Sequence, residues 1–416
     1  MVFLASSALS ISTFQLLRRS SSGDKAVTFW GLLSLGVFGG FSALGTSGVV
    51  LPEFSSQILF AIAGLLLSIS LSRKPRMFNQ ASKHTRPIVF LVFFMILLLL
   101  TVGLFSYSAA FPLLMLAGYS PLLFVVARPL VIKDMRHAIL IGSFGLYVVV
   151  AILALTIPDQ FFGLCRLDKC SVWGQTIGNF SSGNAFGLIL SGVGILLFSF
   201  GSSTLFRGLV ALGSAILIDA SSGRTSLLAF LATVVLLTLI RIIGNTRLRK
   251  NFIIAMVVLG SFVFVLIPFS PEAFTFRGQL WIYAKNMIPE EMWFGYGASD
   301  WVRSANSSGI NLNYSTHNIW LEALYVSGIV GFLVFLVTLT VSKTLWGWDI
   351  GHPQIGIFLW IVIAGTTEVP AFVARPYIFP AVLLIYYLVA LSVDNAENRD
   401  SGLGLVSKKP SEFRIS

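Results

Sequence analysis

Apolar residues fall in long windows of about 20 positions, and short segments with charged side chains separate the windows. A helix of that length rises far enough to cross the roughly 30 Å hydrocarbon core of a bilayer. The strands of a transmembrane barrel would instead alternate apolar and polar residues. The pattern therefore predicts an all-α fold, a polytopic transmembrane helical bundle with 12 spans. The spans are expected at residues 27–49, 56–72, 87–105, 109–127, 138–157, 183–200, 205–220, 225–241, 251–269, 318–341, 354–370 and 376–393.

Composition and charge support this prediction. Of 416 residues, 56% are hydrophobic and 11% are charged, a balance that a water-soluble domain could not bury. With a cytoplasmic N-terminus, 21 of the 28 Lys and Arg residues fall on the inner side and 7 on the outer side. Lys and Arg resist translocation, so we expect both termini to be cytoplasmic. The charges lie in short runs between apolar windows, so we expect membrane lipids as partners and no nucleic acid.

The chain is expected to form a single transmembrane domain over residues 1–393, followed by a disordered cytoplasmic tail over residues 394–416. The first twenty residues place Arg18 and Arg19 after an apolar stretch rather than before it. A cleaved signal peptide has the opposite order. We therefore interpret this opening segment as a short interfacial or dangling piece.

Two predicted outer loops are long, at residues 158–182 and 270–317. The second is too long for a plain connector between adjacent helices, so we expect function there, together with short amphipathic helices. The first holds both cysteines of the chain, Cys165 and Cys170. An oxidising outer compartment would allow a local disulfide, but two isolated buried thiols fit the sequence as well.

His317 is the one histidine that the predicted topology places on the outer face, because the other three fall in cytoplasmic connections. It is therefore the outer candidate for imidazole chemistry. Ser315 or Thr316 can cap the helix that starts beside it, and the positive end of that helix favours a neutral, proton-accepting ring. The alternative is a polar capping residue at a membrane interface.

Arg224 stands among serine and threonine side chains in "DASSGRTSLLAF", at the outer start of a predicted span. Free backbone N–H groups at a helix start and a guanidinium both satisfy anionic phosphate oxygens. The alternative is an arginine that snorkels to the interface, although the positive-inside preference makes an outer arginine less ordinary.

The segment "FRGQLWIYAKNMIPEEMWFGYG" in the second loop has apolar residues at helical spacing until Pro289. This spacing predicts an amphipathic helix on the membrane surface. Arg277 lies in its first turn, where a cation opposes the helix dipole. A bound anion would explain that position, and lipid headgroups are the alternative partner. The apolar positions are Leu280, Trp281, Ala284, Met287 and Ile288.

Aromatic residues are concentrated in the same region. Membrane interfaces collect Trp and Tyr for reasons of solvation, whereas a floor for stacking sugar rings would use the same residues. Composition does not separate the two interpretations. The residues are Trp281, Trp293, Trp301, Trp320, Tyr283, Tyr296 and Tyr314.

Several motifs that would indicate other chemistry are missing from the sequence. There is no D-x-D pair, no P-loop, no H-E-x-x-H and no Cys/His ligand cluster, so we expect no metal and no cofactor. Asp219, Glu322 and Glu368 lie near the outer ends of spans, whereas an ion-coupled transporter would place such groups at mid-depth. A pump or symporter is therefore disfavoured.

Taken in order, four motifs resemble the O-antigen ligase and polysaccharide polymerase superfamily of bacterial envelope glycosyltransferases. They are "GNFSSGNAFGLIL", "SSGRTSLLAF", "FRGQLWIYAKNMIPEEMWFGYG" and "THNIWLEALYVSGIVG". The resemblance covers roughly residues 175–335. It departs from the family pattern before Arg224, where relatives often carry a serine and this chain carries Gly223. Members of the superfamily have about a dozen helices and a large periplasmic loop late in the chain.

The resemblance implies an enzyme of the bacterial inner membrane with its active site on the periplasmic side. It would transfer a glycan from an undecaprenyl-pyrophosphate carrier to an acceptor hydroxyl without a metal and with inversion. Arg224 and Arg277 would hold the pyrophosphate, and His317 would orient or deprotonate the acceptor. Positions with a supporting role in the family are matched by Asn184, Gly297, Asn318 and Glu322.

Three alternatives stay open at this point, and one of them is an envelope scaffold that would not depend on Arg224, Arg277 or His317. A non-enzymatic translocase of lipid-linked oligosaccharides would also use arginines for pyrophosphate and aromatic rings for sugars. Ligases and polymerases share the same donor and differ in whether the acceptor is bound to a lipid or to another glycan.

Overall fold

The computed structural model describes a largely helical protein. It describes residues 2–19, 62, 65, 132–165, 170–172, 174–177, 183–201, 203–243, 247–297, 300–301, 315–344 and 353–370. The spans predicted at 27–49, 87–105, 109–127 and 376–393 lie outside these residues, as do the tail and nearly all of 56–72. The count of twelve spans and the cytoplasmic termini therefore stay predictions.

Seven predicted spans fall on described residues, and each is confirmed as a helix whose ends differ from the prediction by six residues or fewer. The agreement follows from the length of the apolar windows. In an apolar medium, a single segment can satisfy its backbone N–H and C=O groups internally only as a helix. These helices are α8 (Ile132–Thr156), α10 (Gly183–Phe200), α11 (Thr204–Ala220), α12 (Arg224–Ile243), α13 (Arg247–Leu266), α16 (Ile319–Thr344) and α17 (Pro353–Ala364).

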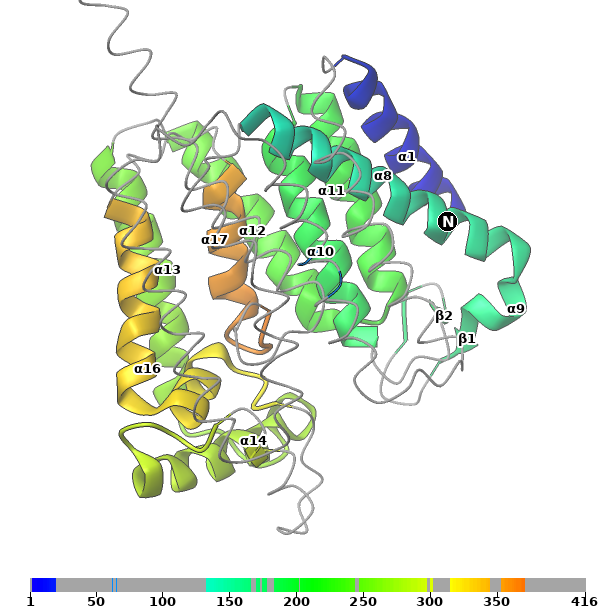
Figure 1. Ribbon diagram of the computed structural model, residues 1–416. Coiled ribbons are helices and arrows are strands. Elements are labelled where there is room, and N and C mark those ends of the chain that lie inside the picture. The colour runs from blue at the N-terminus through cyan, green and yellow to red at the C-terminus, as the bar shows by residue number, and fades with distance from the viewer. Residues whose placement is uncertain are drawn as a thin grey trace, which may run out of the picture.

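The helices pack in a layered bundle (Figure 1). Helix α10 contacts α11, α12 and α17, and α17 also packs against α12 and α13. Helix α16 lies against α13 at one side of the bundle. Two helices, Arg224–Ile243 and Ile319–Leu336, are long and apolar enough to cross a membrane, and shorter apolar helices accompany them in the described part of the chain.

Of the interfacial or dangling piece predicted for the opening segment, the dangling alternative is wrong. The segment forms helix α1 (Val2–Arg19), which packs against α8 and α11 (Figure 1). Leu9 is 1% exposed and sits directly on Gly213, where a Cβ atom would come within 3.0 Å of the leucine. The apolar face of this helix and the glycine opposite it explain why the segment is docked rather than free.

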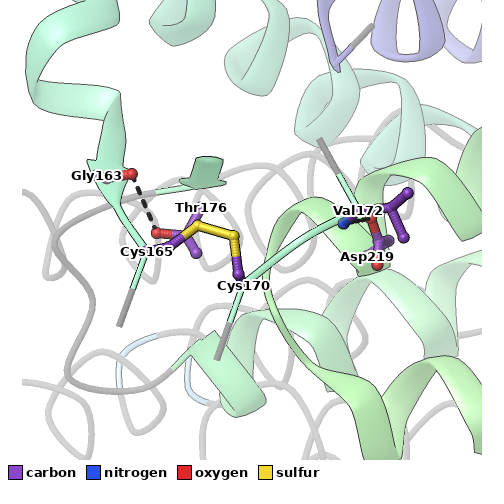
Figure 2. Close-up of a disulfide and its surroundings, with 6 residues drawn as sticks. All are labelled: Gly163, Cys165, Cys170, Val172, Thr176 and Asp219. Carbon is purple, nitrogen blue, oxygen red and sulfur yellow. Dashed lines mark hydrogen bonds between the residues drawn. A yellow bond between two sulfur atoms is a disulfide. The ribbon is translucent and has the colours of Figure 1, made fainter. Parts of the chain in front are cut away.

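The first long loop corrects the purely helical prediction. After the short helix α9 (Pro158–Phe161), strands β1 (Phe162–Leu164) and β2 (Gln175–Ile177) form an antiparallel hairpin. A disulfide between Cys165 and Cys170 closes the segment between the strands (Figure 2). Of the two alternatives left open for the cysteines, the structure has the disulfide.

The second long loop is attached to a break in α16. Gly328 has φ 60°, which interrupts the helix and frees peptide groups on both sides. Residues 292–297 pair with these groups: Gly297 N donates to Val326 O at 3.0 Å, and Ile329 N donates to Met292 O at 2.8 Å. A Cβ at Gly328 would lie 2.4 Å from the backbone of Trp293, so only glycine allows this approach.

Candidate functional site

Several helix ends meet at one end of the bundle. The start of α10 touches the start of α12, where Ser226 Oγ donates to Asn184 O at 3.4 Å. The start of α12 reaches the turn after α17, where Thr225 Oγ1 donates to Glu368 Oε1 at 3.0 Å. Both long loops also lie at this end (Figure 1). This arrangement agrees with the predicted alternation of spans, which places both loops on one face.

Glu368 is the centre of the polar contacts. It lies in the turn after α17 and is 4% exposed. Its Oε1 accepts hydrogen bonds from Thr225 and from Arg277, with which it forms an ion pair. Its Oε2 lies 2.8 Å from Nδ1 of His317. One buried carboxylate therefore joins two of the predicted site residues, which come from different parts of the second long loop.

Arg277 occupies the first right-handed turn of α14 (Ala273–Met287), as predicted. Its side chain is buried, and Nη1 donates to Thr367 O while Nη2 pairs with Glu368. The expected anion is therefore present as a carboxylate of the chain itself. A guanidinium has five N–H groups, so about three remain for another anion.

The three residues before Arg277 form a strained turn. Phe274, Thr275 and Phe276 have φ between 53° and 67°, the left-handed region, at a cost of roughly 1–2 kcal/mol for each residue that is not glycine. Phe274 packs against Trp281 and neighbouring phenylalanines, which helps to hold the turn. A Cβ at Gly278 would lie 1.9 Å from Ser270 O. Strain of this kind is often kept at functional sites.

His317 also has a left-handed backbone, with φ 53°. This conformation corrects the predicted helix cap. Asn318, not Ser315 or Thr316, caps α16, because its Oδ1 accepts hydrogen bonds from the N–H groups of the second and third helical residues, both at 3.0 Å. The serine instead accepts a hydrogen bond from His317 N at 3.3 Å. His317 therefore lies just outside the helix.

Two buried side chains hold the His317 loop in place. Glu322 Oε2 accepts a hydrogen bond from Thr316 N at 2.9 Å. Asn318 Nδ2 donates to Thr366 O at 2.8 Å, which connects the cap to the turn that carries Glu368. Asn318 and Glu322, predicted as supporting residues, are fully buried and contact the loop rather than solvent.

The carboxylate determines the hydrogen bonding of the imidazole. Burial would raise the pKa of Glu368, but the charges of Arg277 and His317 and the hydrogen bonds from both outweigh burial and lower this pKa to about 2. An ionised carboxylate only accepts hydrogen bonds, so Nδ1 of His317 carries the proton. A neutral ring in this tautomer has an unprotonated Nε2 that can accept a proton.

Arg224 is the first residue of α12, and its side chain is exposed. Its neighbour Thr225 connects it to Glu368. Arg224 N donates to Ser222 O at 3.1 Å, and Ser222 has φ 58° in the tight turn before the helix. Arg277 and His317 both contact Glu368 directly. Arg224 precedes Thr225, which is hydrogen-bonded to the same carboxylate, so the backbone of Arg224 lies close to the other two predicted site residues.

The remaining predicted residues have different positions. Asn184 reaches the site end through the contact of its carbonyl with Ser226. Gly297, with φ 81°, pairs through its backbone with Val326, about two turns into α16. It connects the second loop to the helix and is not one of the described residues that contact Glu368.

Three of the four tryptophans of this region are core residues. Trp281, Trp301 and Trp320 are each 3% exposed or less. Trp281 Nε1 donates to Thr316 O at 2.9 Å, and Trp320 Nε1 donates to Ser261 Oγ at 2.8 Å. These rings pack protein elements together. Of these four tryptophans, all within the described residues, only the 60% exposed Trp293 can offer a ring face to a sugar or a lipid.

Glu368 was missed as a site residue by the sequence interpretation, which used it only to argue against an ion-coupled transporter. The available signal was an acidic residue at the outer end of an apolar window, in "AGTTEVPA". Within the described residues, no three His, Cys, Asp or Glu side chains form a group that could hold a metal ion.

Comparison with known families supports the resemblance. Residues 208–336 match the family model described as O-antigen ligase. This range includes Arg224, Arg277 and His317, whereas Asn184 and Glu368 lie outside it. No curated protein matches the chain. The match over residues 208–336 supports the O-antigen ligase superfamily and, with it, a membrane protein that ligates or polymerises glycans in polysaccharide biosynthesis.

Proposed function

We propose that this protein is a metal-independent glycosyltransferase that moves a glycan from an undecaprenyl-pyrophosphate carrier to an acceptor hydroxyl. The observation that supports this most directly is the shared carboxylate of Glu368, which brings a buried arginine and an imidazole together beside the Arg224 helix start. The site would face the periplasm from the bacterial inner membrane. The acceptor is a lipid-bound or glycan-bound hydroxyl.

Each part of the site fits one requirement of the transfer. As the acceptor oxygen attacks the anomeric carbon, Nε2 of His317 accepts the hydroxyl proton. The new C–O bond forms while the bond from the anomeric carbon to the pyrophosphate oxygen breaks, and attack from the opposite face inverts that carbon. Negative charge grows on the leaving pyrophosphate, where fixed cations stabilise it more than they stabilise the bound donor.

The two arginines differ in what they can contribute. Arg224 is exposed at a helix start and can bind phosphate oxygens through its guanidinium and the nearby N–H groups. Arg277 is buried and already bound to Glu368, so it contributes through its remaining N–H groups and its charge. With a neutral ring at His317, the two arginines and Glu368 keep a net positive charge that suits an anionic donor.

Transfer by the purified protein tests this proposal. Undecaprenyl-pyrophosphate-linked repeat units and an acceptor would be incubated with wild-type protein and with Arg224→Ala, Arg277→Ala and His317→Ala. Each substitution should reduce transfer by a factor of about 100 or more, because it removes a base or a charge that acts in the transition state. Arg249→Ala, at the other end of the bundle, is the matched control and should retain activity. Normal transfer by all three variants would exclude the proposed roles.

The same assay separates the proposal from a translocase of lipid-linked oligosaccharides. A translocase moves its substrate without forming glycosidic bonds, so it would yield no new product in detergent. A base held by a carboxylate at His317 favours bond formation, since translocation needs no proton acceptor. The products also distinguish two acceptors: a ladder indicates a polymerase, and a single addition to another lipid indicates a ligase.

A further inference from the structure

The disulfide hairpin has no part in the proposed transfer step, yet it is bound to the C-terminal end of α11, the helix before the one that Arg224 begins. Val172 N donates to Asp219 Oδ2 at 2.9 Å, across 47 residues of sequence (Figure 2). Asp219 is the second-last residue of α11 and stands five residues before Arg224. The first long loop therefore reaches the site through one carboxylate.

The position of Asp219 needs an explanation. A carboxylate at the C-terminal end of a helix meets the negative end of the helix dipole and is unfavourable there. A backbone N–H donor aimed at the carboxylate offsets this, since such charge-assisted hydrogen bonds are stronger than neutral ones. The hairpin supplies that donor from Val172. The contact with the hairpin therefore accounts for a carboxylate at this position, which the dipole of α11 would disfavour.

The hairpin presents this donor from a constrained segment. The Cys165–Cys170 disulfide closes the chain just before Val172. On the far side, β2 contacts α11, and its last residue, Ile177, is buried in the core. Thr176 Oγ1 also donates to Gly163 O across the two strands at 3.4 Å (Figure 2). The position of the Val172 N–H group is thereby limited from both sides.

A tight turn transmits the position of Asp219 to Arg224. Three residues, 221–223, separate α11 from α12. Ser222 N donates to Asp219 O at 2.8 Å, and Arg224 N donates to Ser222 O at 3.1 Å. On the other side, Thr225 is bound to Glu368. Arg224 thus lies between two long-range hydrogen bonds, one to Val172 in the first long loop and one to Glu368 in the turn after α17.

We propose that Asp219 is a positioning residue for Arg224 and that the disulfide hairpin holds it in place. The role of Arg224 as a pyrophosphate ligand rests on the proposed function. Loss of the Asp219 contact should weaken binding of undecaprenyl pyrophosphate by about tenfold and lower kcat/KM for the donor by at least as much. The acceptor KM should not change, because His317 is held by other contacts.

Binding of undecaprenyl pyrophosphate to the purified protein tests the proposal in a cycle. Wild-type protein and Asp219→Asn are each measured with the disulfide intact and after reduction by a phosphine, which is oxidised as the S–S bond becomes two thiols. Either change alone should weaken binding by about tenfold, and the two together should weaken it no further. Asp159→Asn, an exposed carboxylate in α9 beside the hairpin, is the matched control and should bind normally.

The outcomes are distinguishable. Additive losses, or normal binding by Asp219→Asn, would overturn the positioning role while leaving the proposed function intact. Wild-type protein that does not bind undecaprenyl pyrophosphate would overturn the proposed function and this role with it. Reduction of folded wild-type protein needs no substitution, so a misfolded Asp219→Asn variant would not prevent the test. Reduction of the Cys165→Ser/Cys170→Ser variant should have no effect.

Discussion

The two ends of the helix bundle both carry arginines in the first turns of helices, but the arginines have different partners. At the end away from the site, Arg207 Nε donates to Gly201 O at 2.8 Å, and Arg249 Nη1 donates to Ile243 O at 3.0 Å. Each partner is a backbone carbonyl six residues away. At the site end, Arg277 binds the carboxylate of Glu368, 91 residues away.

This difference shows what distinguishes a site arginine from an ordinary one. Carbonyl groups at the end of the preceding helix are neutral and local, and they satisfy a guanidinium without any further function. A buried carboxylate from a distant part of the chain costs desolvation energy and is kept only where its partners compensate. For Arg277, the long-range partner and not the position in a first turn marks the site.

The strongest test of this comparison is Glu368→Ala. The substitution leaves Arg277 buried without its carboxylate, which typically costs about 3–5 kcal/mol, and it removes the group that orients His317. We expect transfer to be abolished and the melting temperature to fall. Glu272→Ala, an exposed carboxylate at the start of α14, should change neither. Full activity of Glu368→Ala would show that the contact is only structural.

A smaller loss of transfer is expected when lysine replaces arginine, which keeps the positive charge and removes the planar guanidinium. Arg277→Lys cannot hold Thr367 O and Glu368 with one planar group, so we expect transfer to fall by roughly 10- to 100-fold. Arg224→Lys keeps a cation at an exposed helix start and should lose less than about tenfold. Transfer rates of the two variants under the same conditions decide the order, and the reverse order would contradict the division of roles between the arginines.

The lowered pKa of Glu368 predicts a dependence of stability on acid. Its pKa is about 2 in the folded protein and near 4.5 ordinarily, so its ion pair contributes fully above about pH 4.5 and is lost as pH falls toward 2. Other carboxylates titrate in this window too, so the measurement compares wild-type protein with Glu368→Gln in thermal unfolding. The difference between the two should shrink as pH falls, and a constant difference would show that the charge is not responsible.

The smallest effect is expected at the other end of the bundle. Arg207→Ala removes one partly exposed hydrogen bond to Gly201 O, which should cost about 1 kcal/mol or less and leave transfer unchanged. Thermal unfolding and the transfer assay would be run in parallel. A loss of transfer as large as that of Arg277→Lys would remove the contrast between the two ends.

Much of the fold could be predicted because apolar windows have few structural solutions in a membrane. Seven helices were located, and α14 was placed correctly with Arg277 in its first turn. The docking of α1 was missed, because it depends on the glycine opposite Leu9 rather than on its own sequence. The β1–β2 hairpin was also missed, since strands of three residues carry too little pattern to recognise.

The candidate site was predicted in its residue types more than in its contacts. His317, Arg224 and Arg277 were predicted from their expected side of the membrane and from their helix starts. The cap of α16 was misassigned because the left-handed backbone of His317 moves the helix start to Asn318. Three tryptophans that could have formed a sugar floor are packed in the core. Burial depends on what lies opposite a ring, and one sequence does not show this.

The order of helices, the end at which the long loops lie and the imidazole and guanidinium groups at that end follow from the sequence, because hydrophobic length and charge act locally along the chain. The contact of the imidazole and guanidinium groups with Glu368 does not follow from the sequence. That carboxylate lies 51 residues from His317 and 143 from Thr225, and the contacts depend on how helices α12, α16 and α17 pack. Local physics selects helices, whereas packing between distant helices selects which polar groups share one buried charge.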